Sequence, residues 1–414
     1  MVKINDFAVE SWMDATEDHC KYNLAETCCA SISVDQLRAL SENKTGQVLD
    51  TSKPLTYGAI RGSAPLRNNL ARLYSAKVAT PLPADNILTT PGAIQANYLA
   101  TYALVGRGDH VICHYPTYQS LYEVPKQMGA EVDLWTAAPA NNWIPAIDDL
   151  KALLRPNTKL IIINNPNNPT GAVLNKSFLQ QIVDIASEKK ITILGDEVYR
   201  PMFHSISPID KEFPPSLLSM GYKNVIVTGS MSKAYSLAGI RVGWIASRNS
   251  ELIETIAAAR HYTTISVSHL DEQVAAFALS ASTVHALLAH NLQLAKANMA
   301  LMEKFVIKNE DECEWVKPLG GTTAFVKFHR EGQPVDSVDF CNQLLEQTGV
   351  LFAPGTCFGH EWKGYVRIGF VNHTEIVEQG LNAATKFIRK NLDDVALAPS
   401  HDLPLRPKTT YNTA

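Results

Sequence analysis

The stretch that decides the fold runs Val227-Thr228-Gly229-Ser230-Met231-Ser232-Lys233-Ala234-Tyr235 and continues as Gly239-Ile240-Arg241-Val242-Gly243-Trp244. The apolar residues from Val225 to Val227 predict a buried strand that ends in small hydroxyl residues and one lysine. A charged amine at the end of a buried strand is unfavourable, so we expect the pKa of Lys233 to be lowered. A neutral amine is able to form a Schiff base with a carbonyl group.

The residues around this lysine favour a phosphate as well as a carbonyl. Ser230, Ser232 and Arg241 offer hydroxyl and guanidinium donors of the kind that bind phosphate oxygens. Pyridoxal phosphate carries both an aldehyde and a phosphate, so it satisfies both halves of the pattern. A serine–lysine pair alone is more often part of a surface loop. Whether this pair belongs to a cofactor site depends on the residues elsewhere in the chain.

Length and composition place the chain among ordinary globular proteins. Its 414 residues, 46% of them apolar and 19% charged, predict two domains rather than one small core. A net charge of −4 without a basic block gives no reason to expect nucleic acid or an anionic membrane as a partner. We find no run of membrane-spanning length, no signal-peptide pattern and no metal-type spacing among the seven cysteines. These features predict a cytoplasmic enzyme with reduced thiols and no metal site.

Strands and helices are expected to alternate through the first two thirds of the chain, which indicates an α/β fold with a mainly parallel sheet between helices. The expected strands are Asn86 to Thr89, His110 to His114, Glu131 to Trp135, Lys159 to Ile163, Ile191 to Leu194, Val225 to Val227 and Val242 to Ala246. Helices are expected from Pro91 to Leu104, from Pro116-Thr117-Tyr118 onward, and from Phe178 to Lys189.

A long helical region is expected from Leu252 to about Phe305, and its later part is expected to lead into a smaller α+β domain. We divide the chain into an N-terminal segment at 1–50 that joins the small domain, a large cofactor-binding domain at 51–290 and a small domain at 291–394. The proline-containing tail at 395–414 is expected to be mobile or to wrap the surface.

Several polar residues follow expected strands, where open α/β sheets carry their sites. Asp196 is suited to pair with a pyridinium nitrogen, although a helix N-cap is the simpler interpretation. Tyr199 lies three residues further on. Asn168 is suited to contact the ring oxygen, or it makes a turn with Pro169. The segment Gly92-Ala93-Ile94 offers backbone N–H groups at a helix N-terminus to a phosphate, and Tyr118 either stacks on the ring or packs in the core.

Taken together and in order, these residues resemble the class I/II aminotransferases, the fold type I enzymes that depend on pyridoxal phosphate. The resemblance covers about residues 20 to 390. It rests on the segment around Tyr57, Pro91-Gly92-Ala93, Tyr115-Pro116-Thr117-Tyr118, Asn165-Pro166-Asn167-Asn168-Pro169-Thr170-Gly171, Gly195-Asp196-Glu197-Val198-Tyr199, the lysine segment through Arg241, Pro354-Gly355-Thr356-Cys357-Phe358-Gly359 and Val366-Arg367-Ile368.

The resemblance implies a role for each residue. Lys233 would form the Schiff base and remove the Cα proton, with Asp196 on the ring nitrogen and Asn168 and Tyr199 on the ring oxygen. Ser230, Ser232 and Arg241 would hold the phosphate, and Tyr57 would be lent by the second subunit of a homodimer with shared sites. Arg367 would clamp the α-carboxylate of a free amino acid, a task suited to its planar fork.

The segment from Asn23 to Ala30 departs from the usual transaminase pattern, because it lacks the expected Gly-x-Pro signature. Asn23-Leu24-Ala25-Glu26 resembles aminocyclopropane carboxylate synthases, and the segment Leu55 to Ser63 resembles capreomycidine synthases. Both use the fold for elimination or ring closure. We therefore favour side-chain elimination or cyclisation of an amino acid or S-adenosylmethionine over transamination, with Glu26 as a candidate side-chain-binding or acid–base residue. A regulatory protein that only binds the cofactor is a third, weaker alternative.

Overall fold

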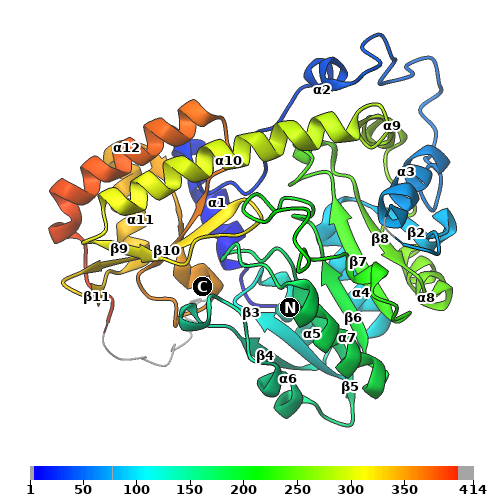
Figure 1. Ribbon diagram of the computed structural model, residues 1–414, viewed down its shortest axis with the longest axis horizontal. Helices are drawn as coiled ribbons and strands as arrows, with labels where there is room; N and C mark the ends of the chain where they lie inside the picture. Colours follow the sequence, from blue (N-terminus) through cyan, green and yellow to red (C-terminus); the bar gives the residue numbers. More distant parts are fainter. Residues whose placement is uncertain (1–3, 77, 400–414) are drawn as a thin grey trace, which may run out of the picture.

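The computed structural model describes residues 4–76 and 78–399, and within them seven strands form one large sheet in the order β2-β8-β7-β6-β5-β3-β4 (Figure 1). The strands β3 to β7 run parallel to one another, whereas β8 is antiparallel to both of its neighbours. Their bounds are β2 Ile87–Thr90, β3 His110–Tyr115, β4 Glu131–Thr136, β5 Thr158–Asn164, β6 Thr192–Asp196, β7 Val225–Ser230 and β8 Gly243–Ser247. The expected α/β fold with a mainly parallel sheet is confirmed.

Helices cover both faces of this sheet, so its strands are apolar on both sides. Along β5, Leu160 and Ile162 belong to one hydrophobic core, and Ile161 and Ile163 belong to the other. The first core also holds residues of α4 and α8, and the second holds residues of α3 and α7. The helices of this part are α3 Ala64–Ser75, α4 Gly92–Leu104, α5 Ser120–Gln127, α6 Ile147–Leu153, α7 Lys176–Lys189, α8 Ser250–Arg260 and α9 His269–Ala278.

The long helix α10 (Val284–Lys308) leads from the large sheet to a second, antiparallel sheet (Figure 1). That sheet has the order β11-β10-β14-β13, with β9 paired to β10, and α10, α11 and α12 pack around it. Its elements are β9 Cys313–Trp315, β10 Thr323–Arg330, β11 Gln333–Pro334, α11 Ser337–Thr348, β13 Ala353–Pro354, β14 Tyr365–Gly369 and α12 Thr374–Asn391.

The N-terminal segment runs between the two sheets. It contains α1 (Ala8–Thr16), the short strand β1 (Tyr22–Asn23) and α2 (Val34–Leu40). We did not predict β1; it pairs in parallel with β12 (Val350–Leu351) far along the chain. A capping box starts α2, because Ser33 accepts from the backbone N–H of Gln36 and the Gln36 side chain accepts from that of Ser33.

Two expectations about the chain differ from the structure, and a third had left two alternatives open. The helical region from Leu252 to Phe305 is interrupted at residues 261–268, where threonine, serine and isoleucine are weak helix formers. Thr117 and Tyr118 form the turn before α5 rather than its first residues. At the start of the tail, Val395 is buried and Ala396 accepts a hydrogen bond from the Asp336 backbone, so residues 395–399 pack on the small sheet, in line with the surface-wrapping alternative. Residues 400–414 of the predicted tail lie outside the described residues.

Within the described ranges, no helix is long and apolar enough to cross a membrane. The domain boundaries at residues 50, 290 and 394 stay predictions.

Candidate active site

A cavity of about 780 Å³ opens at the carboxyl ends of β5, β6 and β7, between the large sheet and the small one. This is the edge at which parallel sheets carry their sites. The predicted residues that line it are Glu26, Ala93, Ile94, Tyr118, Asn168, Asp196, Tyr199, Ser230, Ser232, Lys233, Arg241 and Arg367. The structure therefore brings twelve candidates together from both sheets and from the N-terminal segment.

Two candidates do not line this cavity. Gly92 lies directly beneath it, at the start of α4, and contacts Arg241. Tyr57 lies on the surface with 81% of its area exposed, beside residues 264–270. Tyr57 therefore does not reach the cavity of its own subunit.

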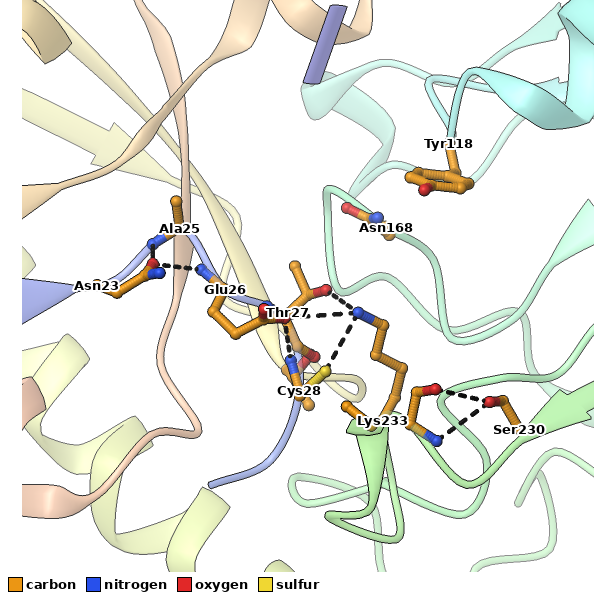
Figure 2. Close-up of polar contacts among 12 residues, drawn as sticks. Asn23, Ala25, Glu26, Thr27, Cys28, Tyr118, Asn168, Ser230 and Lys233 are labelled. Carbon is orange, nitrogen blue, oxygen red and sulfur yellow. Dashed lines mark hydrogen bonds and ion pairs between the residues drawn. The ribbon is translucent and has the colours of Figure 1, made fainter. Parts of the chain in front are cut away.

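The lysine amine is held by the N-terminal segment, as Figure 2 shows. Lys233 Nζ donates to Thr27 Oγ1 at 2.6 Å and lies 3.4 Å from Cys28 Sγ and 3.6 Å from Glu26 Oε1. The Glu26 carboxylate also accepts from the backbone N–H groups of Thr27 and Cys28. The segment is anchored in turn, because Thr322 Oγ1 donates to the Thr27 carbonyl at 2.6 Å.

These neighbours reverse our expectation for the charge of the lysine. Burial lowers the pKa of Lys233, but Cys28, Tyr199 and Glu26 raise it, and the net direction is upward rather than downward. Burial raises the pKa of the Cys28 thiol to about 11, so the thiol is protonated at neutral pH. Glu26 is then the anion beside Lys233. Burial opposes its ionisation, yet Lys233 and the local hydrogen bonds lower the pKa of the Glu26 carboxyl to about 2.

Asp196 ends β6 deep in the cavity. Val198 N donates to its Oδ1 at 3.0 Å, and Asn97 Nδ2 donates to its Oδ2 at 2.9 Å. Asn97, on α4, is fixed by Thr228, whose hydroxyl donates to Asn97 Oδ1 at 2.7 Å. Burial raises the pKa of Asp196 to about 6 despite these donors. A cationic ring nitrogen beside this carboxylate would offset the cost of burying its charge.

Hydroxyl, guanidinium and backbone groups meet at the predicted phosphate end. The hydroxyls of Ser230 and Ser232 lie 2.8 Å apart, and Arg241 Nη1 donates to Ser232 Oγ at 3.3 Å. Arg241 has a left-handed backbone with φ of 51°. The start of α4 approaches so closely that a Cβ on Gly92 would lie 2.7 Å from Arg241 Nη2. Helix N–H groups, a guanidinium and hydroxyls therefore converge on one place, as an anion requires.

Arg367 comes from β14 of the small sheet and is 4% exposed. Its Nη2 donates to the Ala25 carbonyl at 2.8 Å, its Nη1 lies 3.4 Å from Asn168 Oδ1, and its Nε has no partner among the described residues. The hydrogen bonds of this buried guanidinium are incomplete because one donor is unused, and a carboxylate would accept the missing hydrogen bond. Tyr199 lies nearby and is 2% exposed, and burial raises the pKa of its phenol.

Tyr118 lies across the cavity from Lys233 (Figure 2). Its hydroxyl donates to Glu10 Oε1 at 2.6 Å, and its ring lies 4.8 Å from that of Phe7, tilted by 54°. Helix α1 therefore forms part of the cavity wall next to the predicted ring-stacking residue.

Sequence reasoning missed the four polar residues that surround the candidates most closely: Glu10, Thr27, Cys28 and Asn97. Asn97 had a detectable signal, because it lies one helical turn after Ala93 on the same expected helix. Thr27 and Cys28 lie in the quoted segment from Asn23 to Ala30, but their contact with Lys233 spans 206 and 205 residues.

The residues that line the cavity fit pyridoxal phosphate in their chemistry and arrangement. The Lys233 amine lines the same cavity as the anion-binding groups, and the close approach of Gly92 to Arg241 leaves a cradle that a side chain would fill. No group of three or more metal-ligating side chains occurs within residues 4–76 and 78–399.

Comparison with known proteins defines the class. The family model for aminotransferase class I and II matches residues 30–382. Capreomycidine synthase from Streptomyces vinaceus is 30% identical over 378 residues, which cover 91% of this chain and 92% of the relative. Aspartate aminotransferase from Thermotoga maritima is 28% identical over 332 residues, covering 79% of this chain and 82% of the relative. The chain belongs to the class I and II aminotransferase family, and it is an enzyme whose cofactor is pyridoxal phosphate.

Solved structures agree on the fold. A PLP-dependent aminotransferase from Streptococcus suis superposes with a TM-score of 0.83 at 37% identity, covering 94% of this chain and 98% of that one. The PLP-dependent cyclase OrfR superposes with a TM-score of 0.78 at 24% identity, and the match covers 94% of this chain and 98% of that one. Both an aminotransferase and a cyclase thus have this fold, so the fold alone does not identify the reaction that this enzyme catalyses.

Proposed function

We propose that the enzyme removes the Cα proton of a free amino acid with Lys233 and then expels or cyclises a group on the side chain. The supporting observation is the set of titratable groups beside Lys233 Nζ, namely Cys28 Sγ at 3.4 Å and Glu26 Oε1 at 3.6 Å. Transamination needs one lysine that moves a proton between two carbons, whereas elimination also needs a proton for the leaving group. The Cys28 thiol, protonated at neutral pH, is placed to supply it.

The roles proposed for the other residues follow from their positions. Arg367 binds the α-carboxylate through its unused Nε and orients the Cα–H bond toward Lys233. Bound pyridoxal phosphate supplies an electron sink for the Cα carbanion, and Asp196 keeps the ring nitrogen protonated. Asn168 and Tyr199 hold the ring oxygen, Tyr118 stacks on the ring, and the Ser230, Ser232 and Arg241 group with the start of α4 holds the phosphate.

In the step that breaks the side chain, the electron pair left at Cα forms a double bond to Cβ, and the Cβ–leaving-group bond breaks. The leaving group departs with a proton from Cys28 or, after relay, from protonated Lys233. In ring closure, a nucleophilic atom of the side chain adds to Cβ and loses its proton, the electron pair of the double bond returns to Cα, and Lys233 returns a proton to Cα. The 30% identity to capreomycidine synthase over nearly the whole chain also supports this branch.

Transamination is the second candidate. It is supported by the 37% identity to the Streptococcus suis aminotransferase and by the complete set of Lys233, Asp196 and Arg367. In this case Lys233 returns the Cα proton to the cofactor carbon, and a 2-oxo acid is released.

The deciding experiment incubates the holoenzyme with a panel of amino acids and S-adenosylmethionine, without a 2-oxo acid. Products are separated by mass spectrometry, and bound cofactor is assayed for the aminated form. Catalytic turnover to an eliminated fragment or ring supports the proposal. One equivalent of 2-oxo acid with aminated cofactor, and turnover only after a 2-oxo acid is added, refutes it in favour of transamination.

We also propose a homodimer in which the partner subunit donates its copy of Tyr57 to each cavity. The loop residues Leu55 and Tyr57 and the nearby Tyr262 and Ile265 are exposed by 77, 81, 86 and 48%. Residues 55–58, Thr264 and residues 266–270 line one shallow hollow, so Leu55 and Tyr57 lie beside the loop that carries Tyr262 and Ile265. An exposed apolar patch of this kind is typical of a subunit interface. The cytoplasmic location stays a prediction.

A further inference from the structure

Helix α1 is a fixed wall of the cavity rather than a free N-terminal arm. At its start, Ala8 N donates to Gln119 Oε1 at 2.9 Å on the large-sheet side. In its middle, Trp12 Nε1 donates to the Phe352 carbonyl at 2.9 Å on the small-sheet side. The helix is therefore tied to both halves that form the cavity, and its inner face is held in one position.

That inner face carries three carboxylates. Glu10, Asp14 and Glu17 all line the cavity, at the i, i+4 and i+7 spacing that places side chains on one side of a helix. Glu10 accepts from the Tyr118 hydroxyl. Asp14 and Glu17 have no ion-pair partner among the described residues.

The cations of the cavity do not neutralise this face, because each has another task. Lys233 is held by Glu26 and Thr27, Arg241 by Ser232, and Arg367 by Ala25. The unpartnered Nε of Arg367 marks where the carboxylate of a ligand belongs. The amino group of that ligand belongs at Lys233, so its side chain is left to face the remaining wall.

The acidic face is unfavourable for α1 itself. Like charges at i, i+4 and i, i+3 repel each other, and Asp14 and Glu17 lie at the helix C-terminus, where the macrodipole disfavours anions. The first turn, where acids would help, holds Glu10 alone. A cationic group on a ligand would offset both the repulsion among the carboxylates and their unfavourable interaction with the helix dipole.

We infer that the acidic face of α1 selects amino acids whose side chain ends in a positive charge, an ammonium or a guanidinium group. This inference rests on the proposed function only in placing the α-carboxylate at Arg367 and the amino group at Lys233. It holds whether the bound amino acid undergoes elimination, cyclisation or transamination. A neutral side chain of equal size leaves the three carboxylates unpaired, and an acidic side chain is repelled.

The test is equilibrium binding to the holoenzyme, followed by the change in the visible absorbance of the cofactor, with two isosteric pairs. L-Arginine is compared with L-citrulline, and L-lysine with L-2-aminoheptanoic acid, in which a methyl group replaces the ammonium group, while L-glutamate serves as the acidic probe. We expect each cation to bind at least about tenfold more tightly than its neutral isostere, and this ratio to fall as salt is added, because the carboxylates are exposed.

Asp14→Asn and Glu17→Gln should each reduce the ratio several-fold. Asp18→Asn is the matched control, because it removes the same charge one residue further on, at a position that does not line the cavity. All three sites are on the surface, so folding should be unaffected, which circular dichroism checks. Equal binding of arginine and citrulline, tighter binding of glutamate, or an equal effect of Asp18→Asn overturns the inference. Product analysis of the bound substrate tests the proposed reaction separately.

Discussion

Asp196→Asn should stabilise the cofactor-free protein while it disables the enzyme. Burial raises the pKa of the Asp196 carboxyl from 3.8 to about 6. At about pH 8 the buried carboxylate therefore costs roughly 3 kcal/mol of folding free energy, since one pKa unit is about 1.4 kcal/mol. The asparagine removes this cost and keeps the acceptor for Val198 N, but Asn97 must turn its amide, at about 1 kcal/mol. The net gain is about 2 kcal/mol.

The sign of the pH dependence follows from the direction of the shift. The pKa is higher in the folded protein, so wild-type stability is unaffected by this carboxyl below about pH 3.8, falls as the pH rises from about 3.8 to about 6, and levels off above that. Roughly half of the penalty, about 1.5 kcal/mol, develops between about pH 5 and pH 8. The advantage of Asp196→Asn should accordingly be only about 0.5 kcal/mol at about pH 5 and about 2 kcal/mol at about pH 8.

The assay is urea unfolding of cofactor-free wild type and variant at both pH values and one protein concentration. Glu197, whose pKa burial also raises, is present in both proteins, so only its repulsion of the Asp196 carboxylate enters the difference. With cofactor, Asp196→Asn should lose about 30-fold or more in kcat/KM, because a buried charge pair loses a partner. Glu197→Gln alters a neighbouring carboxyl that faces Ser216 instead of the cavity, and should keep most of the activity. A variant that is less stable than wild type at about pH 8, or whose stability runs parallel to wild type with pH, would refute the reasoning.

Four further outcomes are expected. Lys233→Ala should abolish covalent trapping of the cofactor by borohydride, and retained labelling at full stoichiometry would place the Schiff base elsewhere. Arg367→Ala should lower kcat/KM for the true substrate by roughly 30-fold or more, whereas a near-wild-type value would move the carboxylate site. Subunits with Tyr57→Ala and subunits with Lys233→Ala, each weakly active alone, should regain activity when refolded together, because the hybrid dimer has one intact composite site; the absence of regain would argue against shared sites. Glu26→Gln should impair side-chain chemistry while Cα proton exchange with deuterated water continues, and equal loss of both would exclude a steering role.

The residues found from the sequence are those whose position follows from local structure. Asp196 and Lys233 were identified because each follows an apolar strand, and the carboxyl ends of parallel strands meet at one edge. Arg241 was identified from its spacing to Lys233 and from phosphate chemistry. Strands β5, β6 and β7 were predicted for the same reason, since buried strands have a strong local signal.

What the sequence did not reveal depends on contacts between distant segments. We expected the pKa of Lys233 to fall because burial is visible in a strand pattern, but Glu26 and Tyr199 reach the amine only after the fold is complete. The pairing of β1 with β12 was missed because a two-residue strand has no periodicity. The acidic face of α1 follows a helical spacing that is readable in the sequence, yet only the structure shows that it faces the cavity.

The pairing of β1 with β12 makes the N-terminal wall of the candidate site depend on residues that are synthesised late. A ribosome-bound chain that has just exposed Lys233 already has the strands and serines for a phosphate, but Val350 and Arg367 have not yet been made. Residues 22–30 then have no strand to join, and Thr27 lacks the anchor at Thr322 that holds it against the lysine. Cofactor capture at this stage would leave the reactive group open to water and to other amines. The contacts that hold the N-terminal segment against Lys233 therefore depend on Thr322 and β12, and we expect a chain truncated before them to leave Lys233 open to water.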